Sequence, residues 1–198
     1  MTSCRSSVEP LACSDIVDER LLGNPAAELG FEEGVQWVHD TFSTEPTIED
    51  YGIRDDYYQY MLRWQQNDLE YTMGYRQDYW DGFAVRWQQH PPTIQDIFRC
   101  VGEPAYYEAF YDQFPEALYS TLWLFYPERG LGFYHSGPKR LSRFSETTPM
   151  ELILYFEPGQ LEEVVDRVFI GAESSENSKT SFNPWPGSLE EIVIDESR

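Results

Sequence analysis

The chain has 198 residues, of which 41% are hydrophobic and 16% aromatic, so it is long enough for one good hydrophobic core. Its formal net charge is −21, with a sequence pI near 4.3. Because phosphate binding needs clustered Lys and Arg, this charge argues against nucleic acid and anionic lipid as partners of the folded surface. The sequence has no apolar run of transmembrane length, so we expect membrane association only through a lipid anchor.

Residues 1–14 have the composition of a tether. Small residues stand directly before Cys4 and a polar, Ser-rich stretch follows it, which is typical of a mature bacterial lipoprotein. This pattern predicts lipid attachment at Cys4 and an extracellular or cell-envelope location; the alternative is a cytoplasmic protein that begins this way. With Cys4 lipidated, Cys13 and Cys100 would be left as a candidate disulfide pair. Cys100 can equally be a small buried apolar residue on a helix.

Residues 15–90 have the pattern of a first structural repeat. A short helix is expected over residues 15–22, followed by a loop at Gly23-Asn24-Pro25. Apolar residues at helical spacing predict an amphipathic helix through Phe31, Val35, Val38 and Phe42. Strand composition then predicts three strands, over residues 57–65, 69–75 and 83–88.

Residues 91–158 repeat this order. Thr93 and Asp96 match a capping box, and the apolar residues Ile94, Ile97, Phe98 and Val101 lie on one helical face. Gly102 and Pro104 end this helix. A hairpin is expected over residues 118–134, with its turn at Pro127-Glu128-Arg129-Gly130, and a third strand over 151–157. Residues 159–198 then supply a helix, a polar loop at 172–183 that we expect to be mobile, and a docking segment.

Together these elements predict an α+β fold. Two tandem helix-plus-three-strand repeats would form one antiparallel sheet with the helices on one face. Strand alternation then indicates which side chains face the helices and which lie on the open face.

The open face is the candidate binding surface. In the first repeat it would carry the polar residues Arg63, Glu70, Thr72 and Arg86. In the second repeat it would be apolar and aromatic, through Leu122, Leu124, Tyr126, Tyr134, Ile153 and Tyr155. Either the C-terminal segment covers this patch through Phe182, Trp185, Ile192 and Ile194, or the patch contacts a protein or glycan partner.

Three short motifs carry a resemblance to a known family. The motifs are Gly102-Glu103-Pro104, the hairpin turn from Tyr126 to Gly130, and Pro184-Trp185-Pro186-Gly187. They resemble uncharacterised secreted bacterial lipoproteins, over about residues 13–195. The tandem plan is similar to the β-lactamase inhibitory protein, and each unit resembles small outer-membrane assembly lipoproteins of the SmpA/BamE type. The resemblance implies a lipid-anchored envelope protein and says nothing of chemistry, because the motifs are turns and caps.

The sequence indicates no catalytic, metal or cofactor site. His39, His90 and His135 have no metal-ligand spacing, and no nucleophile or nucleotide-binding motif is present. We therefore expect a non-enzymatic cell-envelope binding or scaffold protein that acts through its sheet face or the loop at Lys139–Arg143. The alternative is a soluble acidic inhibitor or mimic that occludes a partner's surface.

Overall fold

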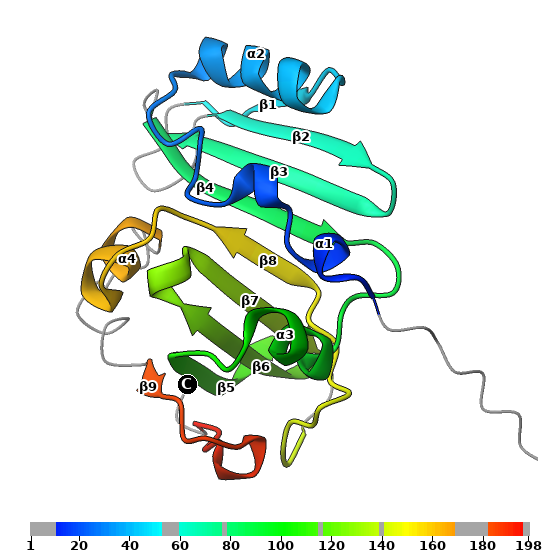
Figure 1. The fold of residues 1–198 in the computed structure, drawn as a ribbon, viewed down its shortest axis with the longest axis vertical. Helices are drawn as coiled ribbons and strands as arrows, with labels where there is room; N and C mark the ends of the chain where they lie inside the picture. The colour runs from blue at the N-terminus through cyan, green and yellow to red at the C-terminus, as the bar shows by residue number, and fades with distance from the viewer. Residues whose placement is uncertain are drawn as a thin grey trace, which may run out of the picture.

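A computed structural model describes residues 11–52, 60–76, 79–114, 117–138, 141–168 and 182–195. In these residues one nine-stranded sheet organises the fold (Figure 1). Its order is β1-β2-β3-β4-β8-β7-β6-β5-β9, and all neighbouring strands pair antiparallel. The strands are β1 Thr47–Asp50, β2 Tyr60–Gln66, β3 Leu69–Arg76, β4 Tyr79–Trp87, β5 Tyr106–Phe114, β6 Ala117–Tyr126, β7 Leu131–Gly137, β8 Leu152–Tyr155 and β9 Asn183–Pro184.

Within the described ranges four α-helices accompany the sheet, and none of them exceeds 12 residues. They are α1 Cys13–Ile16, α2 Phe31–Phe42, α3 Ile94–Val101 and α4 Leu161–Val168, with 3₁₀ turns at η1 Glu19–Leu21, η2 Pro127–Arg129 and η3 Leu189–Glu191. None of the described helices is long and apolar enough to cross a membrane.

The start of α3 shows how local sequence sets a helix boundary. The Thr93 hydroxyl accepts a hydrogen bond from the Asp96 N–H at 3.3 Å, and the Asp96 carboxylate accepts one from the Thr93 N–H at 3.1 Å. This is the predicted capping box. At the other end Gly102 has φ +89°, which a residue with a side chain rarely adopts.

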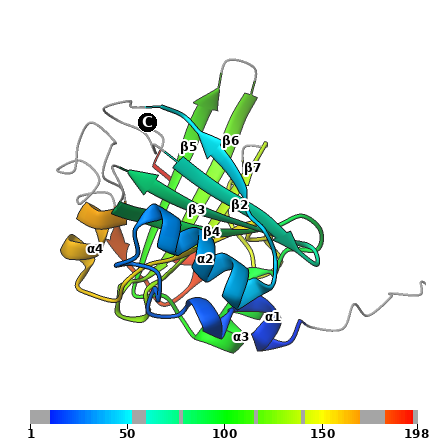
Figure 2. The same cartoon turned by 90° about the horizontal axis from the view of Figure 1, so that it is seen from above.

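The predicted fold class is wrong. The protein is mostly sheet, and it is not built from two helix-plus-three-strand repeats, because β1, β5 and β9 add strands that the prediction did not contain. The helices also do not share one face. A large core lies between the sheet and α1, α2 and α3, which Figure 2 shows on one side of the sheet. A smaller cluster joins α4, through Val164 and Val165, to Phe125 on the opposite face.

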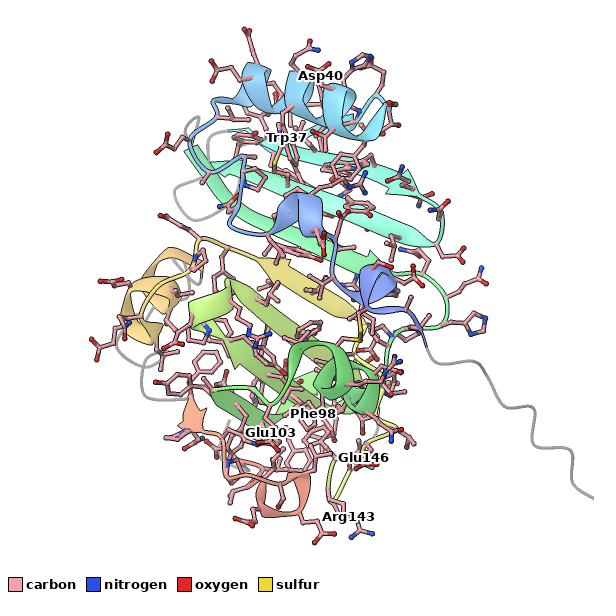
Figure 3. The ribbon with its side chains drawn as sticks, in the orientation of Figure 1. Trp37, Asp40, Phe98, Glu103, Arg143 and Glu146 are labelled. Carbon is pink, nitrogen blue, oxygen red and sulfur yellow. A yellow bond between two sulfur atoms is a disulfide. The ribbon has the colours of Figure 1, made fainter. Side chains whose placement is uncertain are left out.

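Helix α2 illustrates the packing of the large core. Trp37 points from α2 toward the sheet, where its ring lies 6.2 Å from that of Phe83 at right angles, whereas Asp40 points away to solvent (Figure 3). Gly34 lies where a Cβ would come within 1.6 Å of the Tyr75 hydroxyl, so glycine allows α2 to approach β3 closely.

Candidate functional site

Five of the six apolar residues predicted for the open face lie in the core instead. Strand β8 pairs with β4 in the register Phe83↔Tyr155 and Val85↔Ile153, so Tyr155 and Ile153 face the helices with Phe83 and Val85. Successive side chains of a strand point to opposite faces of the sheet, so assigning one of them to the wrong face reverses the prediction for the whole strand. The same error affects β6, and the residues buried as a result are Leu122, Leu124, Tyr126, Ile153 and Tyr155. Tyr134 alone of the six candidates lies on the open face, half-buried.

The open face nevertheless has the predicted character. Its first half carries Arg63, Glu70, Thr72 and Arg86, as expected, and none of these four is buried. Its second half is apolar, through the alternate residues Trp123, Tyr134, Leu152 and Leu154. The rings of Trp123 and Tyr134 lie 4.5 Å apart between centroids. Phe182 and α4 cover the neighbouring part of this face around Phe125, whereas Trp185, Ile192 and Ile194 pack against the large core.

On the helical face, residues 11–22 cross the sheet as a strap before α2 begins (Figure 1). A disulfide joins Cys13 of the strap to Cys100 of α3, with an S–S distance of 2.07 Å. Ile16 and Leu21 bury their side chains in the large core. The strap is therefore attached to the fold by a covalent bond and by two apolar contacts.

Polar contacts in the middle of the strap attach it to the sheet as well. The Asp18 N–H donates to the Tyr155 hydroxyl at 2.8 Å, and the Tyr71 hydroxyl donates to the Asp18 carboxylate at 3.4 Å. Arg20 donates from Nη2 to Asp18 Oδ2 at 2.6 Å and to Gln66 Oε1 at 3.2 Å. Its guanidinium lies 4.3 Å from the centroid of the Phe42 ring, a cation–π contact.

A cavity of about 620 Å³ lies between the strap, the β2–β3 turn and the end of β4. We call it the strap cavity. Three aromatic side chains line it, Tyr71, Trp87 and Tyr155, together with apolar residues such as Val17 and Val85. Asp18, Arg20, Asp68 and His90 add polar groups. A concave, largely apolar site with a few converging polar groups is the usual form of a small-molecule site.

The hydroxyls at this cavity are protonated over the physiological range. Burial raises the pKa of Tyr71 to about 12, and the negative charge of Asp18 acts in the same direction. Burial also raises the pKa of Tyr155, which is 2% exposed. The Tyr71 proton is donated to Asp18, whereas no described residue accepts the proton of the Tyr155 hydroxyl.

A second cavity of about 610 Å³ lies on the other side of the strap, beside the disulfide and η2. Ser14, Val17 and Glu19 line both cavities, so the strap forms the wall between them. None of the described residues that line the second cavity is aromatic. The strap cavity is the better candidate site because only it combines aromatic walls with buried hydroxyls.

The histidines lie on three separate elements. His39 is exposed on α2 beside Asp40, His90 follows β4 at the strap cavity, and His135 is buried on β7 with Nδ1 3.1 Å from the Glu151 carboxylate. Within the described ranges no group of three His, Cys, Asp or Glu side chains could hold a metal ion.

Several predicted features lie outside the described residues. These are the lipid attachment at Cys4, Lys139 and Arg140 of the basic loop, and most of the polar loop at 172–183. Sequence reasoning missed the strap residues Asp18 and Arg20. The candidate Cys13–Cys100 pair was the available signal, because a bond there places residues 15–22 beside the helix at Ile94–Val101.

Comparisons with known proteins identify no family. No protein-family model matches the chain, and neither does any curated protein. Among solved structures the chain is similar to a cysteine-rich secretory protein from Staphylococcus aureus, with 9% sequence identity and a TM-score of 0.35. The match covers 72% of this chain and 48% of that protein, so it spans about half of that protein's length. A TM-score of this size carries no argument about fold or function.

Proposed function

We propose that the protein is a non-enzymatic binding protein of the cell envelope, anchored through Cys4, and that the strap cavity is its ligand site. The observation that carries the ligand site is the placement of Tyr71 and Tyr155. Both hydroxyls come from the centre of the sheet and line a cavity that the strap closes from the other side. Buried polar groups at an aromatic-walled cavity give a ligand orientation and specificity.

Two observations support the envelope location. Small residues precede Cys4 and a Ser-rich stretch follows it, as in a mature lipoprotein. The Cys13–Cys100 disulfide suits an oxidising compartment, where such bonds persist. Intact-mass measurement of the protein from its source membranes tests the anchor. A diacylglyceryl-sized addition on Cys4 is the expected result, and an unmodified Cys4 would contradict it.

The ligand site is tested by blocking the cavity without altering the core. Ser14 is exposed and lines the cavity, so the Ser14→Trp variant should fill it from the strap side. Ser142→Trp is the matched control, because Ser142 is exposed in the loop before β8. Native mass spectrometry of protein purified from its source should show a bound small molecule in the wild type and in Ser142→Trp, but not in Ser14→Trp. Equal retention by both variants would contradict the site.

The ring pair on the open face favours a second function, contact with a protein partner. Tyr134 lies on the same face as Arg86, with Leu152 of β8 paired between them, and aromatic residues with Arg are enriched at protein interfaces. With this second function the protein would be a soluble acidic inhibitor or mimic that occludes a partner's surface. A Trp123→Ala variant should then lose a partner that is cross-linked at the cell surface, while Ile48→Ala, at the exposed edge strand β1, should keep it.

A further inference from the structure

We propose that the Cys13–Cys100 disulfide is a redox switch of the strap: a dithiol reductant cleaves it in the folded protein, and the strap then opens away from the sheet. This inference goes beyond the proposed function, because it depends on the strap and its disulfide and not on a ligand. Three features of the described residues carry it: the exposure of the disulfide, the unequal attachment of its two cysteines, and the place of the strap between two cavities.

The disulfide lies at the surface of the molecule. Cys13 is exposed and Cys100 is half-buried, and both residues line the second cavity beside η2. A thiolate must touch a disulfide sulfur to reduce it, so a buried bond is reduced only after unfolding, whereas an exposed bond is open to direct attack. A reductant can therefore reach this disulfide while the protein is folded.

Reduction moves two electrons from the reductant to the disulfide. One thiolate of the dithiol attacks the sulfur of Cys13, a mixed disulfide forms, and Cys100 leaves as a thiolate. The second thiolate of the reductant then attacks its own sulfur in the mixed disulfide, and Cys13 leaves as a thiolate. The two protons released by the reductant's thiols protonate the two cysteines, and the reductant ends as an intramolecular disulfide. The protein then carries one thiol on the strap and one on α3.

The two cysteines are attached to the fold unequally. Cys100 belongs to α3, which begins with a capping box and buries three side chains in the large core. Cys13 belongs to α1, a single turn of four residues beside α3 that buries only Ile16 (Figure 2). Because α3 has its own capping and core contacts, it should keep its place when the bond is cut. The strap is therefore the element that moves.

The disulfide decides whether the strap is fixed at one end or at both. With the bond intact, Cys13 is fixed to α3 and the turn after the strap is fixed through the buried Ala26. Without it, the described contacts of the N-terminal end include the Arg99–Leu11 hydrogen bond and the packing of Ile16. A cross-link restricts the open conformations of the segment it closes, so cutting it favours opening.

Opening of the strap changes the surface of the molecule. The strap forms the wall between the strap cavity and the second cavity, so its departure joins them in one groove on the helical face of the sheet. Side chains that line the strap cavity and are buried in the closed protein, such as Val85 and Tyr155, then come into contact with solvent. Reduction would thus turn a covered part of the core into an accessible apolar surface.

The first test asks whether the folded protein is reduced directly. The full chain, with Cys4→Ser to remove exchange with the third cysteine, is treated with dithiothreitol without denaturant. Free thiols are alkylated and counted by intact mass. We expect the rate of reduction to rise in proportion to the concentration of dithiothreitol. A rate independent of that concentration would mean that reduction waits for unfolding, and would overturn the switch.

The second test measures opening of the strap by hydrogen exchange and mass spectrometry, before and after reduction. The amides of Val17, Asp18 and Leu21 donate hydrogen bonds in the closed strap, and those of β4 and β8 report on the centre of the sheet. We expect reduction to lower the protection factors of the strap amides at least about tenfold. In the reduced protein they should lie at least about tenfold below those of β4 and β8.

A variant without the disulfide is the matched control for the reagent. The strap of Cys13→Ser with Cys100→Ser should exchange at the rate of the reduced wild type, with or without dithiothreitol. Should this variant not fold, the reduced wild type gives the same reading. A strap whose protection ignores reduction would overturn the switch, because the disulfide would then not hold it closed.

A further outcome separates opening of the strap from unfolding of the whole molecule. Equal protection factors for the strap and for β4 and β8 in the reduced protein would mean that all of them open together, and would overturn the switch. The ligand site is tested on the oxidised protein, so failure of the switch and failure of the proposed function are read from different measurements.

Discussion

The backbone N–H of Asp18 donates a hydrogen bond of 2.8 Å to the hydroxyl of Tyr155, although the two residues lie 137 positions apart. Tyr155 belongs to β8, which joins β4 of the first half of the sheet to β7 of the second half. The bond therefore ties the N-terminal strap to the centre of the sheet, and it forms part of the wall of the strap cavity.

Replacing Tyr155 by Phe should destabilise the protein by about 1–2 kcal/mol, because the Asp18 N–H loses its acceptor while the ring remains. Urea unfolding followed by fluorescence measures this change. Tyr134→Phe is the matched control: its hydroxyl makes no hydrogen bond with a described residue, so its stability should change by less than about 0.5 kcal/mol. Equal losses of stability in the two variants would show that the Asp18–Tyr155 hydrogen bond does not stabilise the folded protein.

The disulfide should contribute strongly to stability, because it closes a separation of 87 residues. A disulfide that closes a loop of this length lowers the chain entropy of the unfolded state, which stabilises the folded protein by up to about 4.5 kcal/mol. Dithiothreitol should therefore lower the melting temperature of the wild type. The double variant Cys13→Ser and Cys100→Ser should melt at the reduced value with or without the reagent. A wild type whose melting temperature ignores the reductant would contradict this prediction.

Gly130 should not tolerate alanine. It has φ +68°, and a Cβ there would lie 2.2 Å from the carbonyl oxygen of Phe156. Gly23 has a similar φ of +72° but open space around it. Gly23→Ala therefore measures only the cost of holding alanine at a positive φ, which is about 1 kcal/mol. We expect Gly130→Ala to lose at least about 2 kcal/mol more than Gly23→Ala in chemical denaturation. Equal losses would mean that the contact with Phe156 relaxes without cost.

Stability should fall as the pH rises above 10. The folded protein holds the proton of Tyr71 until a pKa of about 12, whereas the unfolded chain releases it at the ordinary value of 10.0. Between these values the unfolded state binds fewer protons than the folded state, so the free energy of unfolding decreases with pH. Urea unfolding at pH 8, 10 and 11.5 measures the slope, which Tyr71→Phe should reduce. An unchanged slope in the variant would contradict the raised pKa of Tyr71.

Local features of the fold could be predicted from the sequence. Helix α3 is set by its capping box and by Gly102, which act within a few residues, and α2 by the spacing of Phe31 and Phe42. The polar half of the open face followed from alternation in β3 and β4, where one side of each strand is clearly polar.

The features that depend on pairing between distant strands could not be predicted. Residues 152–156 are apolar without interruption, so alternation does not indicate which of their side chains face the helices. The pairing of Phe83 with Tyr155 decides this. Strand β5 carries aromatic residues on both sides, such as Tyr106 and Tyr107, and so shows no period of two either. The strap cavity depends on both β8 and the strap, and for this reason its residues were not found together.

A crystal structure of the protein purified from its source without refolding tests the ligand site most directly. The proposed function predicts electron density of a small molecule in the strap cavity, within hydrogen-bond distance of the Tyr155 hydroxyl and against Trp87. Ordered water alone between the strap and the sheet, with one of those waters within hydrogen-bond distance of the Tyr155 hydroxyl, would contradict it.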